Sequence, residues 1–452
     1  MSAIINNSFR KFNADNFITS IGNNKVYLMI GKNEPWSGES AGEYVETAPS
    51  DVDVPVPIDS HVSQYIHYND LIAAKLIQST DVSHVLKRID WTSGTVYVEY
   101  DAFADDIIDQ DFFVFTSAFR VYKCICNNSG AVSTVEPTGT STSIIETSDN
   151  YRWKFMFEVQ QADVLKFVTS DWIPVNSPAH SGQPEQAAVE SAAIVGALEH
   201  ISVTSGGSGY RSNVGTAQGG ISNIITLEAT ANINNDWYNG MTVFITSGAG
   251  SGQIRTITDY EGISKNATVD TDWVTIPDTT SEYEVMPAVT ITPVAGDVPV
   301  ASGAHARVSG INQSTGVITK ISMVATGTHY RFVTAEVTSG QPPTGGVDAV
   351  LQPRVSPPGG HGKNAVAELG GAYVMLNSRL IGNEGEDFPV EDDFRKVHLL
   401  LNPTQNNAPA TGTTYNHLEL DQDSGSIIYT EFRGPIIRAS DSTEDIKLVC
   451  EF

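Results

Sequence analysis

Cysteine is scarce in this sequence, and its placement argues against a covalent framework. The chain of 452 residues contains three cysteines, too few for disulfides to staple it together. Cys124 and Cys126 are separated by one residue, so on a strand both would point to the same face. A metal or redox pair is the functional alternative, but there is no second CxC pair and Cys450 stands alone. We therefore expect packed, reduced thiols.

Basic side chains and long apolar runs are also lacking. Lys and Arg number 26 against 53 Asp and Glu, which gives a formal net charge of −27. Such a surface repels phosphate backbones, so we expect no nucleic-acid partner. No run approaches the roughly 18 apolar residues of a membrane span. The N-terminus lacks the charged start and apolar core of a signal peptide, so we expect no membrane association and folding in the cytoplasm.

Motifs for catalysis, cofactors and metals are missing as well. The sequence contains no HExxH and no GxSxG, and His61 and His67 have no third ligand nearby. The glycines of 248–252 lack the Lys and Ser or Thr of a phosphate loop, so we predict a hairpin turn there. The acidic cluster 101–111 has the wrong spacing for a calcium loop, which favours a solvated edge or a docking surface for a basic neighbour. We predict no catalytic, cofactor-binding or metal residues and no enzymatic activity.

The pattern of apolar residues predicts a mainly β protein with an antiparallel β-sandwich core. Short β-branched and aromatic runs are bounded by Gly, Asp, Asn or Ser. They occupy 95–100, 112–115, 119–126 and 153–159. One helix is predicted from Asp59 or Ser60 to Leu76 and a second from Val82 to Ile89, both in a side loop of the sandwich.

The middle of the chain differs from its ends in composition. Pro174, Pro178 and Pro184 suggest a linker, and 357–364 suggests a return linker. We therefore divide the chain into an N-terminal part of the core sandwich, an inserted β region and a C-terminal part of the sandwich. Their bounds are 1–184, 185–354 and 355–452.

An internal repeat is visible within the insertion. Ile201-Ser202-Val203, Gly207 and Tyr210-Arg211 recur as Ile321-Ser322-Met323, Gly327 and Tyr330-Arg331, at an offset of 120 residues (321 − 201). Each copy predicts a strand, a glycine turn and a Tyr that folds back on the sheet. The repeat halves fall around 190–230 and 287–345, with a nested β module at 231–286.

Alternating residues in the last segment predict strands that bury one face. Examples are Val397, Leu399 and Leu401, and also Ile446, Leu448 and Cys450. Such strands need a partner sheet, and the partners of like character are 96–100, 119–126 and 153–159. We expect the two ends of the chain to build one sandwich together.

Many short segments at the two ends resemble one family in their order and spacing. They are 16–22, 26–37, 87–91, 121–124, 149–155, 394–397, 399–403, 424–429 and 433–452. Together they resemble the baseplate wedge subunit of contractile-tailed phages, the gene product eight family of T-even-like viruses. The resemblance covers about 1–176 and 355–452, and it rests on many weak matches kept in one order.

This resemblance implies a structural protein of the virion, located in the tail baseplate of a bacteriophage of the myovirus type and assembled in the host cytoplasm. It implies a homodimer within each wedge that joins other baseplate wedge proteins and supports the baseplate change on tail contraction. The most family-like loops hold the candidate subunit contacts. These are Lys32, Glu34, Pro35, Trp36, Arg433, Pro435 and Arg438. Trp36 fits the core as well as a contact.

Two other function classes remain open. A receptor- or glycan-binding tail protein is suggested by the Ser-, Thr- and Gly-rich insertion, with Trp237, Tyr238 and Trp273 as its candidate surface. A polysaccharide-degrading tail enzyme is the third class, because paired glycosidase carboxylates cannot be detected from spacing. No residue set can be named for it.

Overall fold

The computed structural model confirms a mainly β protein, with 44% of the chain in strands and 13% in helices. It describes residues 7–32, 71–104, 106–175, 183–294, 300–340, 345–380, 393–405, 408–409, 414–415, 426–437 and 444–452. Every strand ladder among these residues is antiparallel. None of the described helices is long and apolar enough to cross a membrane.

The chain divides into two compact units, and each is built from several separate segments. Unit 1 comprises 1–88, 159–179 and 365–452, and unit 2 comprises 89–158 and 180–364. The segment 89–158 thus belongs with the insertion and not with the two ends of the chain. This differs from the division predicted from composition, which placed it in the core sandwich.

Unit 1 contains two main sheets. The five-stranded sheet has the order β26-β2-β1-β23-β27, and the four-stranded sheet has the order β28-β22-β3-β8. The strands of the first are β26 (Thr414–Tyr415), β2 (Leu71–Leu76), β1 (Val26–Lys32), β23 (Asp393–Leu401) and β27 (Ser426–Ile437). Those of the second are β28 (Glu444–Glu451), β22 (Tyr373–Leu380), β3 (Val82–Lys87) and β8 (Trp172–Val175). The other elements are α1 (Asn7–Asn23), η1 (Ser79–Asp81), α3 (Gln161–Phe167), α5 (Ala365–Glu368), β24 (Thr404–Gln405) and β25 (Ala408–Pro409).

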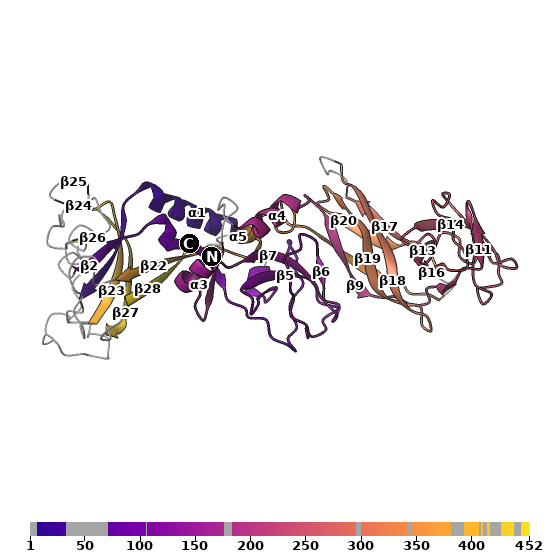
Figure 1. The fold of residues 1–452 in the computed structure, drawn as a ribbon, viewed down its shortest axis with the longest axis horizontal. Helices are drawn as coiled ribbons and strands as arrows, with labels where there is room; N and C mark the ends of the chain where they lie inside the picture. The colour runs from indigo at the N-terminus through magenta and orange to yellow at the C-terminus, as the bar shows by residue number, and fades with distance from the viewer. Residues whose placement is uncertain are drawn as a thin grey trace. The chain divides into compact units, whose positions relative to one another are not determined.

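One hydrophobic core joins these two sheets. Its buried side chains include Leu28 of β1, Leu399 of β23, Leu376 of β22 and Leu448 of β28, with Ile21 of α1 beside them. Because the core draws on both sheets, unit 1 is a sandwich, and each of its sheets contains early and late strands of the chain (Figure 1). The prediction that the two ends build one sandwich is confirmed.

The predicted partners of the C-terminal strands are wrong, however. β23 pairs with β1 and β27, and β22 pairs with β3 and β28. The predicted partners 119–126 and 153–159 instead pair with each other in unit 2. They resemble the C-terminal strands in composition, but they bury their faces in a core of their own.

The two helices predicted between 59 and 89 are also not observed where the structure can be described. Residues 59–70 lie outside the described part, whereas 71–76 form β2 and 82–87 form β3. Val82, Val85 and Leu86 are buried on strand geometry, because β3 lies between β22 and β8. Tertiary pairing therefore overrides an apolar spacing that also fits a helix.

Unit 2 begins with a small four-stranded sheet in the order β4-β5-β7-β6. These strands are β4 (Phe113–Phe115), β5 (Arg120–Cys126), β7 (Arg152–Glu158) and β6 (Ile145–Glu146), with η2 (Ile107–Asp109) before β4. Val189 of α4 (Pro184–Ala192) is packed into the same core as Tyr122, Cys124 and Trp153. The inserted region therefore contributes to this core and is not self-contained from residue 185.

The segment predicted as a strand at 95–100 does not join a ladder. Thr95 forms an isolated bridge with Ser133, and the amides of Val98 and Tyr100 donate to the carbonyls of Asp111 and Cys124. Separate backbone hydrogen bonds therefore link this segment to its neighbours, in place of a regular strand ladder.

The repeat predicted within the insertion is present in the fold. Its strands are β9 (Leu198–Ser205), β17 (Val289–Pro293), β18 (Ser302–Asn312), β19 (Val317–Thr328), β20 (Val333–Val337) and β21 (Val350–Val355). β9 pairs with β21, β19 with β18, and β17 with β20 (Figure 1). β9 of the first copy and β19 of the second are equivalent at the offset of 120 residues, and each pairs with a different partner strand. We call this part the repeat domain.

The tyrosines of the repeat fold back as predicted. Tyr210 and Tyr330 are buried, and their hydroxyls accept hydrogen bonds from the amides of Ala349 (2.9 Å) and Ala304 (3.2 Å). Each Tyr also forms a backbone hydrogen bond with a glycine of the other copy. The Tyr210 amide donates to the carbonyl of Gly316, and the Tyr330 amide donates to the carbonyl of Gly196, both at 3.1 Å.

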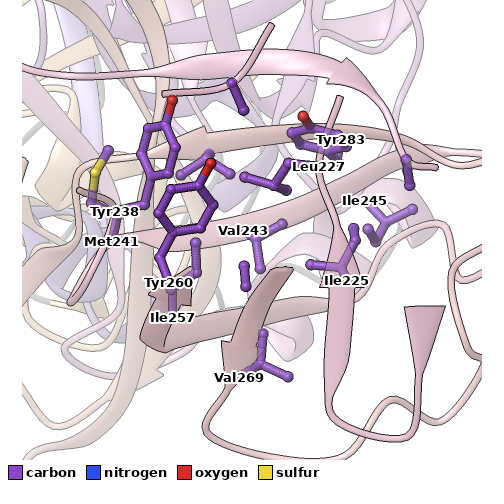
Figure 2. Close-up of a cluster of buried hydrophobic side chains, with 14 of the residues drawn as sticks. Ile225, Leu227, Tyr238, Met241, Val243, Ile245, Ile257, Tyr260, Val269 and Tyr283 are labelled. Atoms are coloured by element: carbon purple, nitrogen blue, oxygen red, sulfur yellow. The ribbon is translucent and has the colours of Figure 1, made fainter. Parts of the chain in front are cut away.

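The nested module is a seven-stranded sheet that begins earlier than residue 231. Its order is β10-β16-β13-β14-β15-β12-β11. The strands are β10 (Asn213–Thr216), β11 (Gly219–Ile221), β12 (Ile224–Thr226), β13 (Thr242–Ser247), β14 (Ile254–Glu261), β15 (Asn266–Val269) and β16 (Glu282–Met286). Residues 248–252 form the turn between the paired strands β13 and β14, which confirms the predicted hairpin. The module encloses a core of its own, drawn in Figure 2.

Candidate functional site

The two loops with candidate subunit contacts are described only in part. Glu34, Pro35, Trp36 and Arg438 lie outside the described residues. Lys32 ends β1, and Arg433 and Pro435 lie within β27. The structure therefore gives the backbone position of three of the seven candidates.

These three positions lie at the same end of one sheet. Lys32 pairs with Phe394 of β23, and Phe394 pairs in turn with Ile436 of β27. The register of β27 is irregular beside them, because Phe432 pairs with Lys396 while Ile436 pairs with Phe394. Residues 433–435 thus form a bulge, where the missing N–H of Pro435 removes no ladder bond.

The three aromatic residues proposed for the surface of the insertion are mostly interior. Tyr238 is 3% exposed and Trp273 is 5% exposed, so the prediction that they form a surface is wrong. Figure 2 shows Tyr238 beside Tyr260, and their rings lie 4.8 Å apart in an edge-on arrangement. Trp237 is half-buried, and the Arg211 guanidinium lies 4.2 Å from its ring centre. A module of this size needs its few large side chains to fill its core.

A cavity of about 530 Å³ opens within unit 2, between the small four-stranded sheet and the repeat domain. Its walls come from the end of β5 and the start of β7 on one side and from β9, β19 and β21 on the other. Polar and charged side chains predominate in its lining, among them Asn150, Arg152, Lys320 and Arg354.

Three side chains with metal-binding chemistry meet in the wall of this cavity. A carboxylate oxygen of Glu99, the thiol sulfur of Cys126 and an imidazole nitrogen of His200 all lie within 4.8 Å of one another. Nε2 of His200 lies 3.7 Å from Oε1 of Glu99. We call these residues the Glu-Cys-His cluster.

Glu99 is held from two sides, by Asn127 after β5 of the small sheet and by Ser202 of β9. Oε1 accepts a hydrogen bond from the Asn127 amide at 3.1 Å, and Oε2 accepts one from the Ser202 hydroxyl at 2.8 Å. The Asn127 side chain is fixed in turn, because it donates to the Tyr97 carbonyl and accepts from the Gly130 amide. The carboxylate is therefore oriented before any ligand arrives.

Within the cluster, Glu99 and His200 each stabilise the charged form of the other. Burial alone would raise the pKa of Glu99, but the hydrogen bond and charge of His200, with the Asn127 and Ser202 bonds, lower it to about 2. Burial would likewise lower the pKa of His200, but Cys126 and Glu99 raise it to about 9. The cluster thus favours a positive charge at the imidazole.

The two cysteines of the CxC pair differ in environment. Cys124 is fully buried in the core of the small sheet, and burial raises the pKa of its thiol well above the ordinary value. Cys126 is only partly buried and lines the cavity. The ladder between β5 and β7 is irregular between these residues, so the expected shared face is not kept.

Sequence patterns did not reveal this cluster, because its members come from three separate segments. One signal was present in the repeat. His200 and Lys320 occupy equivalent positions at the offset of 120 residues (320 − 200), and both line the cavity. The acidic segment 101–111 also turns inward in part, since Asp101 forms an ion pair with Arg354.

Comparison with known proteins adds no assignment. The sequence matches no protein-family model, and no curated protein is significantly similar to it.

Proposed function

We propose that this chain is a structural protein of a phage tail baseplate, acting as a wedge subunit without catalytic activity. The proposal starts from the ordered resemblance of 1–176 and 355–452 to the wedge subunits of contractile-tailed phages. In such a role the protein acts mechanically, by joining neighbouring wedge proteins and supporting the baseplate change on contraction.

One structural observation carries the proposal further than the sequence does. The two family-like loops were chosen separately, from positions about 400 residues apart in the sequence. Lys32 and the 433–435 bulge nevertheless reach the same end of one sheet, separated by β23 alone. Neighbouring strands lie about 4.8 Å apart, so the two backbones are about 10 Å from each other. A single partner surface can contact both.

The arrangement of the sandwich is consistent with a scaffold that carries additions. Segments 1–88 and 365–452 form one unit, and the chain between them folds largely into unit 2. Insertions are tolerated in the loops of a rigid framework, where they add new surfaces without disturbing its core. The additional domains would then distinguish this wedge subunit from simpler ones.

The alternative role in glycan or receptor binding has lost its main support. Aromatic residues that bind sugars must be accessible, and Tyr238 and Trp273 are buried in the core of the nested module. Trp237 remains partly accessible, but it is packed against Arg211.

Electron microscopy of purified particles tests the proposal. A phage that carries a short affinity tag on this chain is labelled with gold and imaged before and after contraction. We expect the label at the baseplate end of the tail in both states. Label on the fibres alone, or particles that lack the chain, would contradict the proposed role.

A further inference from the structure

The Glu-Cys-His cluster presents an oxygen, a sulfur and a nitrogen donor at one place in the wall of the cavity. This mixed set suits a borderline-soft divalent ion such as zinc, which takes carboxylate, thiolate and imidazole ligands. Zinc bonds of about 2.0–2.3 Å place tetrahedral donors about 3.3–3.8 Å apart. The three donors already lie within 4.8 Å of one another, so they need to approach by about 1 Å.

Nε2 of His200, 3.7 Å from Oε1 of Glu99, is the ring nitrogen that faces the cluster. His200 is 7% exposed, and its Nδ1 has no hydrogen-bond partner among the residues that the structure describes. Buried polar atoms without partners are rare in native proteins, and each calls for an explanation such as an ion or an ordered water. A metal ion on Nε2 would leave Nδ1 as the N–H donor that needs a second partner, and ordered water in the cavity that the ring lines can supply it.

The carboxylate of the cluster has the outer support expected of a metal ligand. The Asn127 amide and the Ser202 hydroxyl each bind one oxygen of Glu99. Such outer contacts fix the direction of a ligand, and they are characteristic of metal centres in proteins. Ser202 lies on the same strand as His200, so the two ligands share one support.

Three cations lie near the cluster, and two carboxylates other than Glu99 partly offset their charge. Arg354 lies opposite His200 in the β9–β21 ladder but forms an ion pair with Asp101. Lys320 pairs with Glu146 at 3.1 Å, and Arg152 lies 4.0 Å from the same carboxylate. The Glu99 carboxylate itself faces the His200 imidazole, so a bound ion would take the place of the imidazole proton, which is released on binding.

We infer that Glu99, Cys126 and His200 bind one zinc-like divalent transition-metal ion, with its fourth position open to the cavity. Glu99 precedes the small sheet and Cys126 ends β5, whereas His200 lies on β9. The ion would therefore clamp the small sheet to the repeat domain within unit 2. This metal site is separate from the proposed wedge function and does not depend on it.

Cobalt(II) is a suitable probe, because it replaces zinc and a cobalt–thiolate bond absorbs in the near ultraviolet. Full-length protein is stripped with a chelator, returned to metal-free buffer and titrated with cobalt chloride. We expect one equivalent to bind with a thiolate charge-transfer band, and zinc chloride to abolish the band by displacement. A folded wild-type protein that develops no such band overturns the inference.

Single substitutions identify the ligands. Cys126→Ser should remove the band, and His200→Gln should weaken cobalt binding by at least about 10-fold, the lower range for changes near a metal. Cys450→Ser, in the core of unit 1, is the matched control and should retain the wild-type band. A band that survives Cys126→Ser, or disappears with Cys450→Ser, overturns the inference. Circular dichroism of each metal-free variant confirms folding, and if Cys126→Ser does not fold, the His200→Gln titration decides alone.

Discussion

At the scale of single residues, buried histidine is the feature with the clearest measurable consequence. His361, in the predicted return linker, is 3% exposed, with its Nε2 3.8 Å from a carboxylate oxygen of Glu199. Burial, followed by the positive charges of Lys123 and Lys154, lowers the pKa of His361 well below 6.5. The imidazole therefore stays neutral in the folded protein at neutral pH.

This shift makes stability depend on pH. The unfolded chain binds a proton at His361 near pH 6.5, whereas the folded chain does not. The contribution of His361 to stability is constant above pH 6.5. Below pH 6.5 the free energy of unfolding falls as the pH drops, by up to about 1.4 kcal/mol per pH unit. Urea unfolding at pH 7.5 and 5.5 should show a smaller loss for His361→Gln than for the wild type.

The control for this prediction is His305→Gln, because His305 is exposed on β18. That variant should lose as much stability as the wild type between the two pH values. An unchanged pH dependence in His361→Gln would show that the proton is taken up elsewhere.

The sequence predicts residue roles well where one segment contains the whole signal. Tyr210 and Tyr330 were predicted from the repeat alone, and both fold back on their sheets. Tyr238 and Trp273 were misplaced, because an aromatic residue in a polar segment looks the same whether it faces solvent or a small core. The Glu-Cys-His cluster was missed because only the folded chain brings its three segments together.

At the scale of elements, the turns of the repeat domain depend on two equivalent glycines. Gly196 and Gly316 have φ values of +61° and +66°, at the offset of 120 residues (316 − 196). A Cβ on Gly316 would lie 2.4 Å from the Tyr210 backbone nitrogen, and one on Gly196 would lie 2.5 Å from that of Tyr330. Both the backbone conformation and the close approach therefore require glycine.

Alanine substitution separates these two requirements. Gly94 also has a positive φ, +89°, but a Cβ there would have nothing within 4 Å. Gly94→Ala should cost about 1–2 kcal/mol from backbone conformation alone. Gly316→Ala should cost about 1–3 kcal/mol more, because the added methyl overpacks the turn. Equal losses in urea unfolding would contradict the exchanged packing of the two copies.

The nested module is the element that should fold alone. Its end strands β10 and β16 pair directly, so its entry and exit lie side by side, and its core is separate from that of the repeat domain. We expect a 213–286 fragment to be soluble and to melt cooperatively. Replacing 213–285 with a short Gly-Ser link should leave the rest folded, since Met286 stays in the repeat core.

Excision of 185–352, most of the inserted region predicted from the sequence, is the comparison. Removing those residues would take away α4, whose Val189 fills the core of the small sheet. Calorimetry of the two deletion proteins makes the comparison. If the 213–285 deletion protein aggregates and the 185–352 deletion protein folds well, the independently folding region would be 185–352 and not the nested module.

Strands were predictable where apolar and polar residues alternate or where β propensity is strong. Examples are 119–126 and 153–159, which form β5 and β7. They were not predictable at 71–76 and 82–87. Spaced apolar residues in those segments fit a helix face, and only pairing with β1 and β22 selects strands.

At the scale of the whole molecule, the wedge proposal implies self-association. The chain has a mass of 48.6 kDa, so light scattering after size exclusion should give about twice this mass. Stable interfaces bury about 1,200–2,000 Å² or more. Because the net charge is −27, repulsion should weaken the dimer at low ionic strength, and moderate salt should strengthen it. A monomer at all salt and protein concentrations would argue against the dimer.

The shared sandwich of unit 1 was predictable as a whole, although its strand pairs were not. Alternation at 397–401 and 446–450 indicated strands that bury one face against a partner sheet, but most of the partner segments predicted for them, 96–100, 119–126 and 153–159, belong to unit 2. The pairing of β1 with β23 depends on contacts across more than 350 residues, which no local pattern records.

A cryo-electron microscopy map of the particle's baseplate tests the central claim most directly. We expect density for two copies of the unit 1 sandwich in each wedge, with the end of the sheet that holds Lys32 and the 433–435 bulge against a neighbouring protein. A baseplate map in which every wedge density is assigned to other chains, with this protein absent or confined to a fibre, would contradict the account.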